Sequence, residues 1–303
     1  MTHADRPTDA PRPSLAAGIV RSLRPKQWAK NVLVVAAPVA AGVIDQGEVL
    51  LHTAGAFACF CAAASATYLV NDATDVEADR LHPTKRNRPI AAGVVSPGLA
   101  YALAAVLLVA ALVGGFLLEP DFGWVLVAYL GLTTAYTYWL KEQPVLDIVA
   151  ISAGFVLRAV GGAAAVGVPI SEWFFIVTSF GALFMVTGKR HGESLDLADD
   201  AVAVRPALGA YTPSFLHYLR AVFSGGVLIA YCIWAFTSGQ TNPDGAVLFQ
   251  VSIVPFAVAI LRYALLLDQG KGAEPEVLIL SDRIVLGAGV VWAIIYGCAV
   301  YTS

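Results

Sequence analysis

The feature that most constrains this chain is a series of apolar runs, most of them long enough to cross a lipid bilayer. A membrane-spanning helix needs about 20 predominantly apolar residues. Only 14% of the residues are charged, whereas a soluble domain carries about 25%. The first run is short, and Pro38 is expected to kink it. We therefore predict an all-α integral membrane protein with nine transmembrane helices, at residues 28–45, 49–70, 97–118, 122–140, 146–167, 172–188, 216–238, 246–267 and 277–301.

The lysines and arginines indicate how these helices are oriented. If the N-terminus lies in the cytosol, all of the 19 basic residues except Arg158 fall on the cytosolic side. The connections on the opposite side, such as IDQGE and EPDFG, contain no Lys or Arg. Basic residues concentrate on the cytosolic side of membrane proteins. The sequence therefore predicts a cytosolic N-terminus and a multi-pass protein of the plasma membrane.

Outside the apolar runs, the chain has a polar tail and two long connections. Residues 1–20 are polar and contain several prolines, which predicts a flexible cytosolic tail; residues 21–303 are expected to form one transmembrane domain. The connections 71–96 and 189–215 share the cytosolic face, where we expect catalysis. A net charge of −3 without a separate basic region argues against a nucleic-acid partner. The lipid bilayer is the expected partner, and the sequence leaves homo-oligomer formation open.

An acidic stretch, NDATDVEAD, follows the second apolar run directly at residues 71–79. If the helix continues past the membrane surface, Asp72, Asp75 and Asp79 fall at i, i+3 and i+7 on one face. Magnesium takes hard oxygen ligands, often one or two carboxylates together with substrate phosphates. The stripe therefore predicts a Mg²⁺ site that holds a diphosphate, with these three acids as catalytic and metal-binding residues. The alternative is a solvated helix end whose acids serve solubility.

Basic side chains close to this stretch favour a phosphorylated substrate. Lys85, Arg86 and Arg88 follow within the same connection, and such cations bind phosphate oxygens. Basic residues and aromatic rings near a membrane surface are also common interface anchors, so this alternative applies to several further candidates. The remaining candidate substrate-binding residues near the cytosolic face are Lys26, Gln27, Lys30, Asn31, Tyr68, Asn71, Tyr136, Tyr138, Lys141, Lys189 and Arg190.

Arg158 is the one basic residue expected deep in the membrane. It lies eleven residues after Asp147, which corresponds to a depth of about 16 Å at the helical rise. A buried arginine is costly and marks either function or a paired structural role. Two interpretations stay open at this point. Arg158 either pairs with an acid or a carbonyl of the bundle, or meets the phosphate of a lipid substrate.

The acidic stretch and the apolar runs together resemble the UbiA superfamily of intramembrane prenyltransferases. The pattern Asn71-Asp72-x-x-Asp75-x-x-x-Asp79 matches the first aspartate-rich motif of that family. The resemblance implies a helical bundle around a lipid-lined cavity, capped by two acidic connections that hold Mg²⁺ and diphosphate. The second motif departs from the family pattern, because the corresponding segment reads GKRHGESLDLADD. Asp196 is taken as its metal ligand and Glu193 as a substrate-binding residue, and the working acid among Glu193, Asp196 and Asp200 stays open.

A narrower resemblance concerns the segments RPKQWAKN, at residues 24–31, and HPTKRNRPIAAG, at residues 82–93. They are similar to the decaprenyl-phosphate phosphoribosyltransferases. This implies transfer of a 5-phosphoribosyl group from 5-phosphoribosyl 1-diphosphate (PRPP) to a polyprenyl phosphate, with decaprenylphosphoryl-5-phosphoribose as product and cell-wall arabinan synthesis as its use. The attacking phosphate oxygen is already ionised at neutral pH. Such a reaction therefore needs no general base.

Two other functions compete with this interpretation. An ordinary UbiA enzyme would move a prenyl group from prenyl diphosphate to an aromatic ring. Its donor has one anionic end, whereas PRPP has two, and the three basic clusters on one face favour PRPP. A transporter would place charges at the membrane midplane and show inverted repeats. Only Arg158 is expected to lie deep, which disfavours a transporter.

Overall fold

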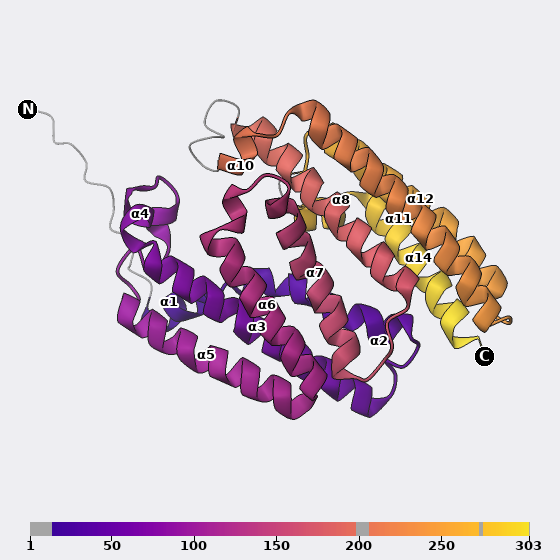
Figure 1. Cartoon of the computed structure of the whole chain (residues 1–303), viewed down its shortest axis with the longest axis horizontal. Coiled ribbons are helices and arrows are strands. Elements are labelled where there is room, and N and C mark those ends of the chain that lie inside the picture. Colours follow the sequence, from indigo (N-terminus) through magenta and orange to yellow (C-terminus); the bar gives the residue numbers. More distant parts are fainter. Residues whose placement is uncertain (1–13, 198–205, 273–274, 303) are drawn as a thin grey trace, which may run out of the picture.

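The computed structural model describes residues 14–197, 206–272 and 275–302, and all regular secondary structure in them is helical. Figure 1 shows the arrangement. The all-α prediction is thus confirmed. In chain order the helices are α1 (Leu15–Ser22), the 3₁₀ helix η1 (Pro25–Val35), α2 (Ala36–Ala40), α3 (Gly47–Thr74), α4 (Val76–Leu81), η2 (Lys85–Asn87), α5 (Pro97–Leu118), α6 (Pro120–Tyr138), η3 (Leu140–Glu142), α7 (Leu146–Ala165), α8 (Glu172–Leu197), α10 (Pro206–Gly209), α11 (Pro213–Thr241), α12 (Ala246–Asp268), α13 (Pro275–Ser281) and α14 (Arg283–Tyr301).

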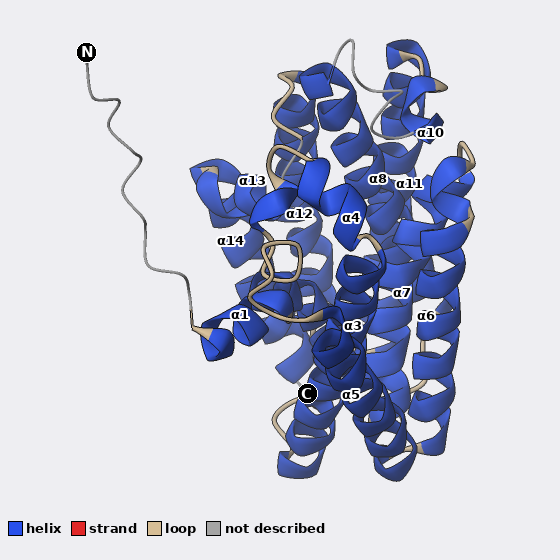
Figure 2. Ribbon diagram, turned by 90° about the vertical axis from the view of Figure 1, so that its left-hand side faces the viewer, coloured by secondary structure: helices blue, strands red, loops and turns tan. Residues whose placement is uncertain are grey.

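The long helices form two groups that follow the order of the chain. Helices α3, α5, α6 and α7 lie together, and α8, α11, α12 and α14 form the other side of the bundle (Figure 1). Each long helix packs against the next long helix in the sequence, and contacts between α7 and α8 join the two groups. The short helices α4, α10 and α13 lie toward the upper end of the bundle in Figure 2.

Six helices of the described residues are long and apolar enough to cross a membrane: α3, α5, α7, α11, α12 and α14. The predicted spans 122–140 and 172–188 coincide with the continuous helices α6 and α8. The predicted tail covered residues 1–20; α1 begins within that range at Leu15, and residues 1–13 lie outside the described residues.

The first predicted span, residues 28–45, does not form one continuous α-helix. It consists of η1 up to Val35 and the five-residue helix α2, which carries Pro38. The 3₁₀ segment packs closely against α7, where a Cβ added to Gly162 would lie 1.9 Å from the carbonyl oxygen of Val34. Glycine is therefore required where the two backbones meet. This close approach places η1 beside α3 and α7.

An aromatic cluster fills the space between α3 and α6. Phe60 packs edge-on against Phe122 and Tyr129, with ring centroids 5.7 and 5.3 Å apart. Small buried residues of α3, including Ala56 and Ala63, let neighbouring helices approach closely. Tyr129 also lines a cavity that contains Arg158, so this core borders the candidate site.

Candidate active site

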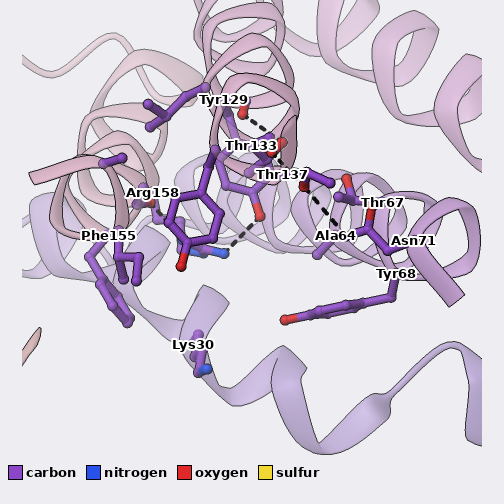
Figure 3. Close-up of a pocket in the computed structure, with 15 residues that line it drawn as sticks. Lys30, Ala64, Thr67, Tyr68, Asn71, Tyr129, Thr133, Thr137, Phe155 and Arg158 are labelled. Carbon is purple, nitrogen blue, oxygen red and sulfur yellow. Dashed lines mark hydrogen bonds between the residues drawn. The ribbon is translucent and has the colours of Figure 1, made fainter. Parts of the chain in front are cut away.

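A cavity of about 220 Å³ lies between η1, α3, α6 and α7. Five of the predicted substrate-binding residues line it: Lys30, Tyr68, Asn71, Tyr136 and Arg158. Figure 3 labels all of them except Tyr136. They come from four elements that are far apart in the sequence. The fold thus brings together residues that sequence patterns had marked separately.

Arg158 of α7 lies at the wall of this cavity, and its hydrogen-bond partners among the described residues are all neutral. Its Nε donates to Asn31 Oδ1 at 2.8 Å, its Nη1 to the Gly154 carbonyl at 2.6 Å, and its Nη2 to the Tyr129 hydroxyl at 2.8 Å. The guanidinium also lies over the Tyr129 ring, 4.8 Å from its centroid. No ion pair between described residues involves Arg158. A buried charge without a countercharge is costly, and it makes the cavity attractive to an anion.

Asp72 and Asp79 converge on one arginine at the edge of the cavity. Both residues are 3% exposed, and Arg88 Nη1 contacts Asp72 Oδ1 at 3.1 Å and Asp79 Oδ2 at 2.7 Å. Arg24 Nη2 donates to Asp72 Oδ1 at 2.6 Å. The Arg24 guanidinium lies 4.5 Å from the centre of the Tyr68 ring, which lines the cavity. This first rim cluster consists of Arg24, Asp72, Asp79 and Arg88.

Asp75 does not join its two neighbours in the acidic motif. Helix α3 ends at Thr74, Asp75 is its C-cap with φ −89° and ψ 10°, and α4 begins at Val76. Asp75 is exposed, whereas Asp72 and Asp79 are buried. The three acids therefore do not form one uninterrupted helical stripe. The break in the helix lets the buried pair turn toward Arg88 while Asp75 faces solvent.

The buried acid pair fits a divalent cation that completes its shell with substrate oxygens. The described residues contain no group of three or more His, Cys, Asp or Glu side chains placed to hold a metal. Two carboxylates already share one cationic group at 2.7 and 3.1 Å. Mg²⁺ is usually held by one or two protein carboxylates and substrate phosphates. The donor set of Asp72 and Asp79 thus matches Mg²⁺ bound together with a diphosphate.

The other predicted cations and polar residues divide between the rim, the interior and the outer surface. Lys85 and Arg86 are exposed on η2, so only Arg88 of that basic group joins the rim cluster. Lys26 and Gln27 border a separate outer groove beside α1. Asn31 is fully buried, donates to Cys61 Sγ at 3.2 Å and accepts from Arg158. Asn31 therefore positions Arg158.

Two further candidates near the end of α6 lie away from the cavity lining. Tyr138 is 66% exposed. Lys141 is half-buried on η3. Asn71, by contrast, lies in the cavity and its Nδ2 donates to Thr137 Oγ1 at 3.5 Å, as the dashed line in Figure 3 shows.

A second rim cluster forms around Arg190 on α8. This side chain is 1% exposed and donates through Nε to Asp147 Oδ2 at 2.8 Å and through Nη1 to Glu193 Oε2. Its Nη2 lies 3.4 Å from the Tyr136 hydroxyl, which lines the cavity. Lys189 Nζ lies 3.9 Å from Glu193 Oε1. The second motif thus supplies an acid–base network that reaches the cavity through Tyr136.

Tyr211 completes the support of Asp147 within this network. Its hydroxyl donates to Asp147 Oδ1 and accepts from the Val145 amide at 2.6 Å. Burial and the hydrogen bond to Asp147 raise the pKa of Tyr211. Tyr211 therefore keeps its proton at neutral pH and acts as a hydrogen-bond donor to the carboxylate.

The metal prediction for Asp196 falls at the limit of the described residues. Its backbone belongs to the end of α8, but its side chain lies outside the described part of the structure, as do residues 198–205 with Asp200. Sequence reasoning did not select Arg24, Tyr129 or Asp147 as site residues. Asp147 carried a signal, because an acid at the start of an apolar span needs a partner.

Comparison with known proteins places the motifs and the fold in one family. Residues 32–282 match the sequence profile of the UbiA prenyltransferase family. A protein named decaprenyl-phosphate phosphoribosyltransferase from Mycolicibacterium smegmatis is 42% identical over 100% of this chain and 98% of its own. The protein of that name from Mycobacterium tuberculosis is 45% identical over 96% of both chains. A solved UbiA homolog from Archaeoglobus fulgidus bound to GPP and Mg²⁺ has a TM-score of 0.71 at 18% identity, covering 94% of this chain and 100% of that one. The resemblances predicted from the sequence are confirmed.

Proposed function

Because the chain belongs to the UbiA prenyltransferase family, we propose that it transfers the 5-phosphoribosyl group of PRPP to decaprenyl phosphate and releases diphosphate. The product is decaprenylphosphoryl-5-phosphoribose, which would serve cell-wall arabinan synthesis. The similarity to phosphoribosyltransferases extends over nearly the whole chain. The proposed activity therefore rests on relatives that resemble this chain over nearly its whole length.

The observation that carries this proposal is that the site has two separate charged regions, the first rim cluster and Arg158. PRPP has a diphosphate at C1 and a phosphate at C5, so it has two anionic ends. The site offers the first rim cluster at one end and the guanidinium of Arg158, which lacks a carboxylate partner among the described residues, along the cavity. A prenyl diphosphate has only one anionic end and would leave the buried charge of Arg158 unmatched.

The rim residues would hold the diphosphate end of the donor. Asp72 and Asp79 are the carboxylates that would hold Mg²⁺, and Asp75 and Asp196 are further candidates from the two motifs. When bound, Mg²⁺ neutralises the charge that develops on the leaving diphosphate. Arg24 and Arg88 already contact these acids, so they lie where diphosphate oxygens would arrive. Exposed Lys85 and Arg86 add positive charge along the entry route.

The 5-phosphate end would extend into the cavity toward Arg158 and Lys30. Guanidinium groups bind phosphate through short charge-assisted hydrogen bonds. Three neutral partners fix the Arg158 side chain before the substrate arrives, so little further ordering is needed. Anchoring both ends of the donor holds C1 at the mouth of the cavity, between the two rim clusters.

The bond changes at C1 need positioning more than proton transfer. An oxygen of the lipid phosphate forms a bond to C1, and the bond from C1 to the diphosphate oxygen breaks, with the electron pair leaving on diphosphate. The attacking oxygen is ionised, so the chain supplies no general base. Holding the two anionic reactants together in the correct geometry lowers the barrier.

The membrane arrangement is also part of the proposal. We infer nine crossings in one domain, with the N-terminus and the active site at the cytosolic face of the plasma membrane. The uneven distribution of Lys and Arg supports this orientation. Helices α6 and α8 pack against members of the group of six helices that are long and apolar enough to cross a membrane, and η1 with α2 would form the interrupted first crossing. Homo-oligomer formation is compatible with this arrangement.

A transfer assay in membranes that contain the protein tests the function. The membranes receive Mg²⁺, ribose-labelled PRPP and decaprenyl phosphate, and the lipids are then extracted. We expect label in the lipid phase only when decaprenyl phosphate is present. A parallel reaction contains labelled prenyl diphosphate and an aromatic acceptor. Transfer only in that reaction would assign the chain to aromatic prenylation instead.

A further inference from the structure

Residues of α8, α11 and α12 line a second cavity of about 280 Å³. These helices lie on the other side of the bundle from α3 and α6 (Figure 1). The second cavity shares no lining residue with the first cavity. Part of its wall is apolar, and part is polar. The residues that matter here are Phe184, His217, Arg220, Ala221, Ser224 and Asp268.

Arg220 is a buried cation whose inner edge has no hydrogen-bond partner among the described residues. The residue is 6% exposed. Its Nη2 lies 3.3 Å from Asp268 Oδ1 and 3.1 Å from His217 Nδ1, but its buried Nε and Nη1 have no partner. The Asp268 side chain is 63% exposed, so solvent weakens its compensation of the buried charge.

Polar atoms on α8 extend this unpaired region. Thr187 Oγ1 and His191 Nδ1 are buried without hydrogen-bond partners in the described structure. They lie one helical turn apart, on the same face of α8 as Phe184, which lines the cavity. His191 is within electrostatic range of Arg220. Unpaired buried polar atoms are rare in native proteins, and their grouping here points to a ligand with oxygen acceptors.

We propose that this cavity binds the phosphate group of a membrane lipid, with Arg220 as its charged ligand. The unpartnered Nε and Nη1 of Arg220 can both donate hydrogen bonds to phosphate oxygens. The apolar wall formed by Phe184 and Ala221 suits a hydrocarbon chain, and Leu265 at the cavity is 48% exposed toward the outside of the bundle. A free phosphate ion would not use this apolar surface.

The place of the site in the fold links it to the catalytic side. His191 follows Arg190 directly in α8, and Arg190 holds Asp147 in the second rim cluster. Successive side chains of a helix point about 100° apart, so Arg190 reaches Asp147 while His191 lies on the adjacent face, toward Arg220. A lipid bound at Arg220 would therefore steady the end of α8 that carries Arg190. The inference needs the membrane setting but not the phosphoribosyl chemistry.

Native mass spectrometry of the full chain in detergent tests the proposal. The probes are dioleoyl phosphatidylglycerol, which has a phosphate and two tails, dioleoylglycerol, which has the tails alone, and inorganic phosphate. We expect retained phosphatidylglycerol and little retention of the other two. Equal retention of dioleoylglycerol would show that the phosphate does not contribute to binding. Retention of inorganic phosphate alone would show that the site does not bind a lipid.

Two variants and one control locate the binding. Arg220→Gln removes the charged ligand and should weaken phosphatidylglycerol binding about tenfold or more, as expected when charge-assisted hydrogen bonds are lost. Ser224→Leu keeps Arg220 and fills the cavity from its half-buried wall position, so it should weaken binding even if the first variant folds poorly. Arg283→Gln removes an exposed arginine at the start of α14 and should bind like the wild type. Wild-type binding by Ser224→Leu and by any folded Arg220→Gln would overturn the site.

Discussion

At the scale of single residues, the proposed chemistry depends on a few buried charges with incomplete neutralisation. Asp72 and Asp79 share Arg88, and Arg158 is held only by neutral groups among the described residues. Each arrangement can bind a further charged ligand. The acid pair would take a metal with diphosphate, and the arginine would take a phosphate.

The first prediction concerns the acid pair. Asp72→Asn keeps the shape of the side chain and its contact with Arg24 but removes a charge needed for metal and diphosphate. We expect turnover to fall at least about 100-fold, as for loss of one preorganised electrostatic contact, with folded protein retained. Glu77→Gln is the matched control, because Glu77 is exposed and its ion-pair partner among the described residues is Arg80. Wild-type turnover in Asp72→Asn would remove this carboxylate from the site.

The second prediction separates the two substrates at Arg158. Arg158→Met keeps an unbranched buried side chain but removes the charge that faces the cavity. We expect the KM for PRPP to rise about 10- to 100-fold, as for loss of charge-assisted hydrogen bonds, and the KM for decaprenyl phosphate to change less. Steady-state kinetics with each substrate varied in turn measures this. The reverse pattern would place the lipid phosphate, and not the 5-phosphate, at Arg158.

Some of these residues could be selected from the sequence and others could not. The spacing of the acidic motif marked Asp72, Asp75 and Asp79 together, because a local helical pattern places them on one face. Arg24 and Asp147 gave weaker signals, since their partners lie 48 and 43 positions away. The separation of Asp75 from the pair depends on a local break between α3 and α4, which periodicity alone does not reveal.

At the scale of helices, the cavity depends on how closely η1 approaches α7. Gly162 makes this approach feasible, and Asn31 of η1 then reaches Arg158. The sequence predicted the positions of the long helices well because a spanning helix has a strong apolar signal. It did not predict the 3₁₀ form of η1, since that form is selected by contacts with α3 and α7.

The third prediction tests this contact. Gly162→Ala places a Cβ 1.9 Å from the Val34 carbonyl oxygen, and backbone on both sides must shift. We expect a loss of about 2 kcal/mol or more, in the range of overpacked cores, seen as a lower thermal transition in detergent. Gly287→Ala in α14 is the control, because nothing lies within 4 Å of an added Cβ there. Equal stability of both variants would contradict the close packing.

At the scale of the whole molecule, two groups of helices share one charged end. Both rim clusters lie near the ends of their helices, and α7 and α8 connect the groups. Family and fold could be predicted from the sequence because the motif and the apolar runs are both specific. The number of crossings could not be settled in the same way, since η1 and α2 interrupt the first span.

The fourth prediction uses the parity of the crossings. An odd number places the two termini on opposite sides of the membrane, so a reporter at the N-terminus should lie inside and one at the C-terminus outside. Fusions to each terminus in a bacterial host measure this location. Alkaline phosphatase is active only outside the cytosol, and green fluorescent protein fluoresces only inside it. Both termini on one side would exclude nine crossings.

The most direct test of the central claim follows the two halves of the donor separately. PRPP carries a carbon label in its ribose and a phosphorus label in its diphosphate, and reacts with decaprenyl phosphate and Mg²⁺. We predict that wild type and Glu77→Gln send the carbon label to the lipid phase, while the phosphorus label stays in the aqueous phase as free diphosphate. With Asp72→Asn, nearly all of both labels should stay in the aqueous phase as unreacted PRPP. Phosphorus label in the lipid, or undiminished carbon transfer by Asp72→Asn, would contradict the account.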